Sequence, residues 1–135
     1  EKIKLFLEER KAKIVKEAED DIIHMVLDIS KKVIHQELKQ NQDIIISLVK
    51  KAIEKSAYKN EIAIKVSSED YDYVLENKDR IKGLVEGISE VQIVEDKHLK
   101  KGDCILDTLG GEVNSSIDLQ IKEIEEAFLF ILRNE

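Results

Sequence analysis

The side chains best suited to chemistry in this sequence are one cysteine and three aspartates in its last third. Cys104 is expected at the start of a strand, and no neighbour in sequence suggests the base and thiolate-stabilising setting that a nucleophile needs. We therefore interpret Cys104 as a buried structural side chain. Asp103, Asp107 and Asp118 could pass for a carboxylate cluster, but Asp118 is better explained as a helix-start residue. A small cytosolic α/β enzyme that uses Cys104 or these aspartates stays an alternative.

The histidines and glycines do not form a recognisable metal or nucleotide site. His24 and His35 are eleven positions apart, so they share one side of a helix but are separated by about 16 Å of helical rise. His98 lies in a lysine-rich loop. The lone cysteine excludes Cys-x-x-Cys clusters and a disulfide within the chain, and Gly110-Gly111 lacks the Lys-Ser/Thr pair of a phosphate loop. We expect no metal, no cofactor and no enzymatic activity.

The composition favours long helices and disfavours nucleic-acid binding and membrane insertion. Of 135 residues, 38% are charged and 4% aromatic, with no proline and five glycines. The formal net charge of −7 repels phosphate backbones, and no apolar run approaches the roughly 18 residues of a membrane span. The single cysteine fits a reducing cytoplasm, which is the predicted location. Because Glu1 is not methionine and lies within a helical pattern, we expect a fragment of a longer chain.

Residues 1–38 contain no glycine and no proline, and they predict one long amphipathic helix, similar to a coiled coil. Its apolar stripe steps by 4, 7, 4, 7 and 4 residues, and an eleven-residue repeat favours a slight right-handed supercoil. We interpret the helix as a stalk whose stripe mediates pairing, although it could instead fold back on its own core. The candidate dimerisation residues are Ile3, Leu7, Ile14, Ala18, Met25 and Ile29.

Residues 39–135 predict a small α/β head, so that the fold class is α+β with two domains, 1–38 and 39–135. Asp43 is a suitable N-cap for a helix over 44–57. Alternation predicts a strand over 61–67, and Ser67 with Asp70 forms a capping box for a helix that runs to about residue 87, with a break near Asp79. A strand over 91–95 should then lie parallel to the first strand.

The rest of the head predicts a hairpin and a final helix, which gives a mixed sheet of about four strands. A strand over 104–108 leads to a two-residue turn at Gly110-Gly111 and a short strand over 112–115. Ser115 with Asp118 forms a second possible capping box for a helix over 117–132. Residues 127–132 of that helix are apolar all round, so either the first helix wraps them or another protein covers them. The candidate partner-binding residues are Phe128, Leu129, Phe130, Ile131 and Leu132.

The segment from Gly102 to Leu132 resembles the closing segment of the FliH family of flagellar type III export proteins. That segment has a glycine–cysteine strand, an acid–threonine pair, a glycine turn, and an Asp-Ala-Ser-apolar-Asp helix start. Asn114 stands where an aspartate is usual, and Ser115 where alanine is usual. The residues that carry the match, expected to be structural, are Gly102, Cys104, Asp107, Thr108, Gly110, Val113, Asn114, Ser116, Ile117, Asp118 and Gln120.

The resemblance implies a non-enzymatic adaptor or stator that forms a homodimer through its N-terminal helices. It also implies that the head docks on the N-terminal region of the export ATPase, FliI, and restrains it until it reaches the export gate. Peripheral-stalk E subunits of vacuolar and archaeal ATPases share the glycine turn and are the rival family. The Ser-x-Asp-x-Gln spelling, from Ser116 to Gln120, favours FliH.

Overall fold

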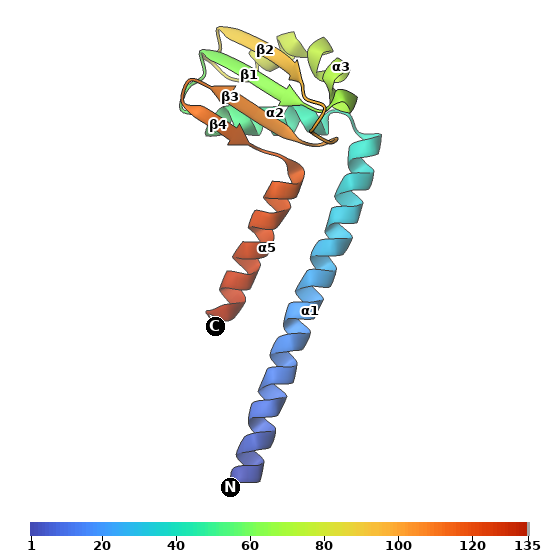
Figure 1. The fold of residues 1–135 in the computed structure, drawn as a ribbon, viewed down its shortest axis with the longest axis vertical. Helices are drawn as coiled ribbons and strands as arrows, with labels where there is room; N and C mark the ends of the chain where they lie inside the picture. Colours follow the sequence, from blue (N-terminus) through green and yellow to red (C-terminus); the bar gives the residue numbers. More distant parts are fainter. Residues whose placement is uncertain (135) are drawn as a thin grey trace. The chain divides into compact units, whose positions relative to one another are not determined.

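The computed structural model describes residues 1–134 and has the predicted α+β class, with a long N-terminal helix, a four-stranded mixed sheet and a C-terminal helix (Figure 1). In chain order the elements are α1 Lys2–Gln40, α2 Ile44–Lys55, β1 Glu61–Val66, α3 Ser68–Glu76, α4 Lys78–Lys82, β2 Glu90–Glu95, β3 Cys104–Thr108, β4 Gly111–Asn114 and α5 Ile117–Arg133.

The residues form two compact units. The head unit comprises residues 35–120, and the helical unit comprises residues 1–34 together with α5 from residue 121 onward. Both α1 and α5 thus contribute their head-proximal turns to the head unit and the rest of their length to the helical unit. The predicted division into domains 1–38 and 39–135 stays a prediction.

The sheet of the head unit has the strand order β2-β1-β3-β4. β1 runs parallel to β2, with Ile62 opposite Val91, as the strand–helix–strand pattern predicted. β1 runs antiparallel to β3, with Ile64 opposite Leu106, and β3 runs antiparallel to β4. The sheet therefore combines one parallel pair with a hairpin added on the other side of β1.

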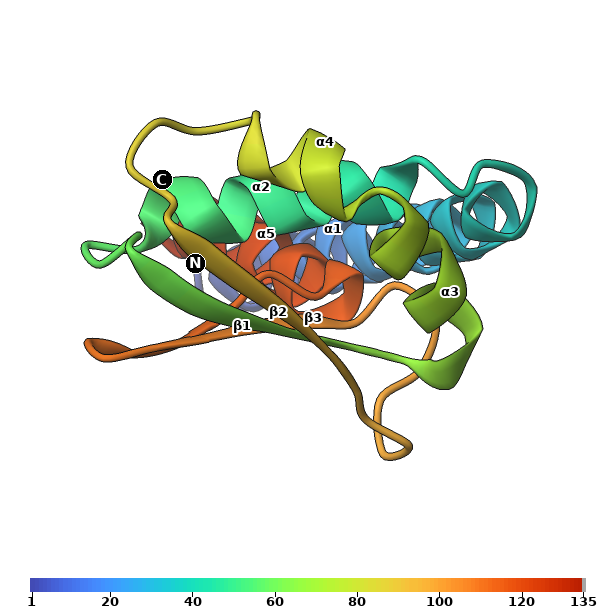
Figure 2. The same ribbon diagram turned by 90° about the horizontal axis from the view of Figure 1, so that it is seen from above.

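One face of this sheet carries the core. Alternation along β1 places Ile62, Ile64 and Val66 on the buried face. Seen from above, α2 runs along that face (Figure 2), where it lies against β3 while α3 and α4 lie against β2. The buried apolar side chains from these elements are Ile45, Ile46, Leu48, Val49, Ala52, Ile53, Ile62, Ile64, Val66, Val74, Ile81, Val91, Ile93, Cys104 and Leu106.

The start of α3 confirms one predicted cap, whereas its end differs slightly. Ser67 has extended backbone angles, and its Oγ accepts a hydrogen bond from the backbone N–H of Asp70. The helical segment breaks at Asn77, two residues before the expected position at Asp79. The Asn77 side chain donates to the carbonyl oxygen of Tyr73 at 2.8 Å, which satisfies an acceptor in the last turn of α3.

Asp43 precedes α2, but the prediction that it caps this helix is wrong. It has helical backbone angles and makes no side-chain cap bond. Instead, its two oxygens accept hydrogen bonds from Arg80 Nη1 at 2.6 Å and Nη2 at 2.8 Å, and Tyr73 Oη donates at 2.6 Å. A bidentate hydrogen bond to a guanidinium is stronger than a single hydrogen bond from a neutral backbone N–H. Arg80 therefore determines the orientation of the Asp43 carboxylate.

The hairpin and the start of α5 also differ in detail from the prediction. Because Thr108 pairs with Gly111, the turn residues are Leu109 and Gly110 rather than Gly110 and Gly111. Gly111 lies in β4 with a φ of 114°, which favours glycine. The capping box expected from Ser115 and Asp118 does not form, because Ser115 Oγ donates to the carbonyl oxygen of Leu48 at 2.8 Å.

Candidate functional site

The segment that resembles the FliH family, Gly102 to Leu132, begins with a glycine that packs tightly against the end of α1. Gly102 has a φ of 90°, and a Cβ added there would lie 2.8 Å from Cδ1 of the buried Leu38. Its backbone N–H donates to Asp70 Oδ2 at 3.0 Å, while Lys101 Nζ donates to Asp70 Oδ1 at 2.8 Å. Asp70 is 3% exposed, so these partners satisfy a buried carboxylate. Gly102 thus joins the loop before β3 to both α1 and α3.

Hydrogen bonds from polar side chains hold the connection between β4 and α5 in place. Ser116 Oγ accepts from the backbone N–H of Cys104 at 3.0 Å, and Asn114 Oδ1 accepts from the backbone N–H of Ser116 at 2.9 Å. Gln120 Nε2 donates to the carbonyl oxygen of Ser115 at 2.6 Å, and Gln120 Oε1 accepts from Lys51 Nζ at 2.9 Å. These bonds fix the first turn of α5 to β3 and α2.

Asp118 joins three segments of the head unit. His35 Nε2 near the end of α1 lies 3.0 Å from Asp118 Oδ1, and Lys100 from the loop before β3 forms an ion pair with Asp118 Oδ2. The hydrogen bond from Lys100 holds the pKa of Asp118 below its ordinary value, with a smaller contribution from His35, although burial opposes this shift. Asp118 therefore acts as an anchor for the bases of α1 and α5.

The remaining motif residues stabilise the hairpin. Asp107 Oδ2 lies 3.9 Å from Lys65 Nζ, which is also 3.5 Å from Glu112 Oε1. At Gly110, an added Cβ would clash with the ring of Tyr58, so the turn lies directly against this ring. The backbone N–H of Gly110 donates to Thr108 Oγ1 at 3.1 Å. All the predicted structural motif residues thus lie together in the head unit.

The structure does not favour catalysis by Cys104 or metal binding by the histidines. Cys104 is fully buried, and burial raises the pKa of its thiol to about 11, although a hydrogen bond with Ser115 opposes the shift. A thiol of this pKa is almost wholly protonated near neutral pH, so it is a poor nucleophile. His24 in α1 lies 3.4 Å from Glu125 in α5. Within residues 1–134, no group of three or more histidine, cysteine or acidic side chains could hold a metal ion.

The predicted dimerisation stripe lies exposed along α1. Ile3, Leu7, Ile14, Met25 and Ile29 are between 56% and 68% exposed. Ala18 is exposed as well. The stripe is therefore not used for a fold-back onto the chain's own core.

Sequence reasoning missed that the apolar surface of α1 is broader than this stripe. Other large side chains along α1 are also about half exposed or more, namely Leu5, Phe6, Val15, Ile22, Val26 and Val33. A signal was present, because Val15 with Val26 and Ile22 with Val33 repeat the eleven-residue spacing beside the stripe. Leu5 lies on the side of Leu27, but the other five side chains widen the stripe into a band.

A second side of α1 is used within the chain. Leu27 is 7% exposed, and Met25, two positions away, points to nearly the opposite side of the helix. The ion pair between His24 and Glu125 places α5 along α1 within the helical unit. The stripe is thus a separate surface, opposite the buried Leu27.

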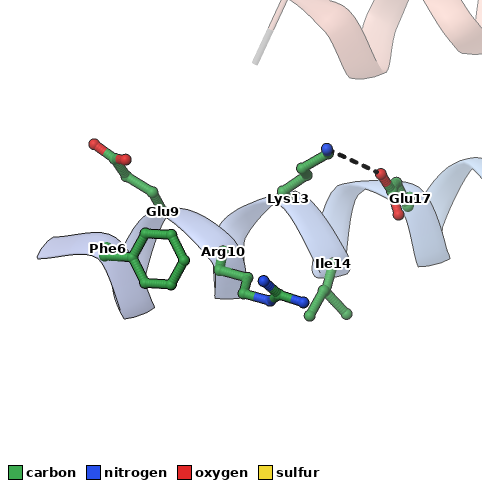
Figure 3. A pocket seen from close by; sticks show the side chains of 6 residues that line it. All are labelled: Phe6, Glu9, Arg10, Lys13, Ile14 and Glu17. Atoms are coloured by element: carbon green, nitrogen blue, oxygen red, sulfur yellow. Dashed lines mark ion pairs between the residues drawn. The ribbon is translucent and has the colours of Figure 1, made fainter. Parts of the chain in front are cut away.

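A shallow hollow along α1 is lined by Phe6, Glu9, Arg10, Lys13, Ile14 and Glu17 (Figure 3). All six belong to one helix, and Lys13 and Glu17 form an ion pair at 4.0 Å beside the apolar side chains. Small-molecule sites enclose most of their ligand between several elements. A surface made by one helix instead suits a neighbouring helix.

The predicted partner-binding segment at the end of α5 is largely exposed. Phe128, Phe130 and Ile131 are 50%, 69% and 58% exposed, whereas Leu129 and Leu132 are partly buried. Ile124, one turn earlier than Phe128, is 50% exposed as well. The sequence offered two explanations for this apolar segment, wrapping by α1 or cover by another protein. In the structure, α1 leaves these side chains uncovered. The segment is therefore an available apolar surface.

Comparison with known proteins points in one direction. The family model described as flagellar assembly protein FliH matches residues 1–124. A flagellar assembly protein FliH from Borreliella burgdorferi is 32% identical over 120 residues, which cover 89% of this chain and 39% of that protein. A probable flagellar assembly protein FliH from Bacillus subtilis is 25% identical over 118 residues, which cover 87% of this chain and 56% of that protein.

The chain thus spans from about two fifths to just over half of the length of these relatives. In the part of the chain that the structure describes, no helix is both long and apolar enough to cross a membrane. The family match extends over α1 and the whole head unit, well beyond the segment from Gly102 to Leu132 whose residue pattern suggested the resemblance. The chain belongs to the FliH family of flagellar assembly proteins.

Proposed function

We propose that this chain is a non-enzymatic adaptor of the cytoplasmic flagellar export apparatus. It forms a homodimer through α1 and binds the N-terminal region of the export ATPase, FliI, which it restrains until the ATPase reaches the export gate. Membership of the FliH family supports the role in flagellar assembly. The partners are inferred from the resemblance and from the two exposed apolar surfaces.

The observation that carries the homodimer is the exposed stripe on α1. It extends from Ile3 to Ile29, which corresponds to about 40 Å of helix at 1.5 Å per residue. A continuous apolar surface of this length is unfavourable in water and marks an interaction site. A second copy offers an identical stripe of matching length, which makes self-pairing the simplest way to cover it.

The exposed end of α5 is the proposed contact with the ATPase. Phe128 and Phe130 are aromatic side chains of the kind that anchor protein interfaces. They lie in the C-terminal half of α5, whereas the polar network of the head unit holds the first turn of this helix. Buried Cys104 supports a protein that works by binding rather than by catalysis.

Two variants separate the proposed interfaces. Met25→Glu places a charge in the stripe and should convert the dimer to a monomer in sedimentation equilibrium. Phe128→Ser with Ile131→Ser should abolish capture of the N-terminal region of FliI while the mass of the free protein stays that of a dimer. Leu109→Ser is the matched control, because Leu109 is 86% exposed in the β3–β4 turn and should affect neither measurement.

Two outcomes would contradict the proposal. A wild-type protein that stays monomeric at all accessible concentrations would remove the homodimer. Undiminished capture of FliI by the α5 variant would assign the ATPase contact to another surface. Circular dichroism that matches wild type should accompany each result, so that a loss of binding is not a loss of folding.

A further inference from the structure

The ring of His24 in α1 lies between two groups that only accept hydrogen bonds. Its Nδ1 is 2.8 Å from the backbone carbonyl oxygen of Asp20, and its Nε2 is 3.4 Å from Oε1 of Glu125 in α5. A neutral imidazole carries a single N–H, so in this position its other nitrogen presents a lone pair to an acceptor. Only the protonated ring has an N–H for both groups. The geometry therefore fits a positively charged His24.

The charged groups around the ring also favour its protonated form. The hydrogen bond to the Asp20 carbonyl oxygen raises the pKa of His24, and the carboxylates of Glu125, Asp20 and Asp28 raise it further, although desolvation opposes them. The pKa is thus higher when His24 is paired than when it is free. The stability of the pair is therefore complete below the pH at which a free histidine loses its proton, about 6.5, and it is lost as the pH rises through the pKa of the paired ring.

The outer part of α5, from residue 122 onward, has little apolar contact to hold it in place. Of the α5 residues, all of which the structure describes, Ile121 is the buried one, whereas Leu129 and Leu132 are only partly buried. Leu132 borders a hollow of about 480 Å³ that Ala12 and Val15 of α1 also line. Side chains that border an unfilled space lose dispersion contacts on that side. Packing alone therefore holds this part of α5 weakly.

The pair of His24 and Glu125 is the charged link between this part of α5 and α1. Within residues 1–134, no other ion pair reaches α5 beyond residue 120. The side chain of Glu125 is 25% exposed, whereas the neighbouring Glu126 is exposed. A change in the charge of His24 therefore acts directly on the contact between the two helices.

Detachment of the outer part of α5 would enlarge its apolar surface. Phe128, Phe130 and Ile131 are already at least half exposed, and detachment adds the sides of Leu129 and Leu132 that are now partly buried. A partner that covers the whole circumference of residues 127–132 binds only the detached form. Its apparent affinity then rises with the detached fraction.

From these observations we infer that His24 is a proton-controlled latch. The protonated ring holds α5 against α1 through Glu125, and the neutral ring lets the outer part of α5 detach and present residues 127–132 on all sides. A partly exposed ion pair changes such an equilibrium roughly two- to fivefold. The identity of the partner rests on the proposed ATPase contact, whereas the latch concerns this chain alone.

Spin labels on Lys11→Cys and Arg133→Cys measure the separation of α1 and the end of α5. Lys11 lines the hollow and Arg133 follows Leu132, and both are exposed, whereas native Cys104 is fully buried and should not be labelled. An excess of unlabelled chain keeps two labelled copies out of one dimer. Between about pH 5 and pH 8, the ratio of long to short distances should rise roughly two- to fivefold.

Two variants assign this response to the pair. His24→Gln is neutral at every pH and should abolish the response, although it retains His35 and His98. Glu126→Gln, which removes an exposed carboxylate beside Glu125, is the matched control and should keep the response. Wild-type distances that do not change with pH, or an unchanged response in His24→Gln, would overturn the latch.

Capture of the N-terminal region of FliI separates the latch from the proposed function. Wild-type capture should be roughly two- to fivefold tighter at the upper end of this pH range, and His24→Gln should remove the difference. Capture that ignores pH while α5 still detaches would overturn the link between the latch and the ATPase. Absence of capture at every pH, with detachment intact, would overturn the proposed ATPase contact and support the latch as a property of the chain alone.

Discussion

Replacing Gly102 with alanine is expected to lower the free energy of unfolding of the head unit by about 2–4 kcal/mol. Its φ of 90° lies where a side chain costs roughly 1–2 kcal/mol. The new Cβ would lie 2.8 Å from Leu38 Cδ1, and such overpacking costs roughly 1–3 kcal/mol. The reduced entropy of the unfolded chain offsets about 0.4–1 kcal/mol of this loss.

Gly87→Ala is the matched control. Gly87 has a φ of 95°, but nothing lies within 4 Å of its added Cβ. It should therefore suffer the backbone cost without the clash, a loss of about 1 kcal/mol or less after the entropic offset. The difference between the two variants isolates the contact between Gly102 and the end of α1.

Urea unfolding followed by tyrosine fluorescence is a suitable assay, because the chain has no tryptophan and all three tyrosines lie in the head unit. The double variant Leu38→Ala with Gly102→Ala should lose less stability than the sum of the two single variants, since truncation of Leu38 removes the atoms that clash with the new Cβ. Equal stability of the Gly102 and Gly87 variants, or a double variant with no coupling between the two changes, would refute the reasoning.

Three further predictions concern single groups of the head unit. Arg80, and then Tyr73, lower the pKa of Asp43 from 3.8 to about 2, so the stability that this carboxylate contributes is complete above about pH 3.8 and is lost as the pH falls toward 2. Arg80→Gln should therefore flatten the loss of stability over this range in acid titrations, and an unchanged slope would contradict the assignment. Cys104, with a pKa of about 11, should be alkylated in the native protein only at the rate of unfolding; rapid labelling at neutral pH would revive the enzyme hypothesis. Ser116→Ala should cost about 1–3 kcal/mol in thermal or urea unfolding because the buried N–H of Cys104 loses its acceptor, whereas Ser116→Thr, which keeps a hydroxyl, should cost less.

Features set by short-range patterns were predictable from the sequence. Alternation of Ile62, Ile64 and Val66 located β1, and the Ser67 cap located the start of α3 within one turn. The period of the apolar residues gave α1 and its stripe, because a helix repeats every 3.6 residues whatever its surroundings. The residue pattern around Asp118 indicated the FliH family, and the match to the family model confirms it.

Features set by partners far along the chain were not predictable in this way. Asp43 was expected to cap α2, but Arg80, 37 residues later, forms two bonds with it. Ser115 was expected to begin a capping box, but folding brings it to Leu48, 67 residues earlier. A carboxylate or hydroxyl takes the strongest partner that the tertiary structure supplies, and a local pattern does not contain that information.

The most direct test of the account is the mass, by light scattering, of this chain mixed with the N-terminal region of FliI. The account predicts a dimer of the chain alone and a complex that contains two copies together with the ATPase region. A chain that elutes alone as a monomer, apart from the ATPase region at every mixing ratio, would contradict it.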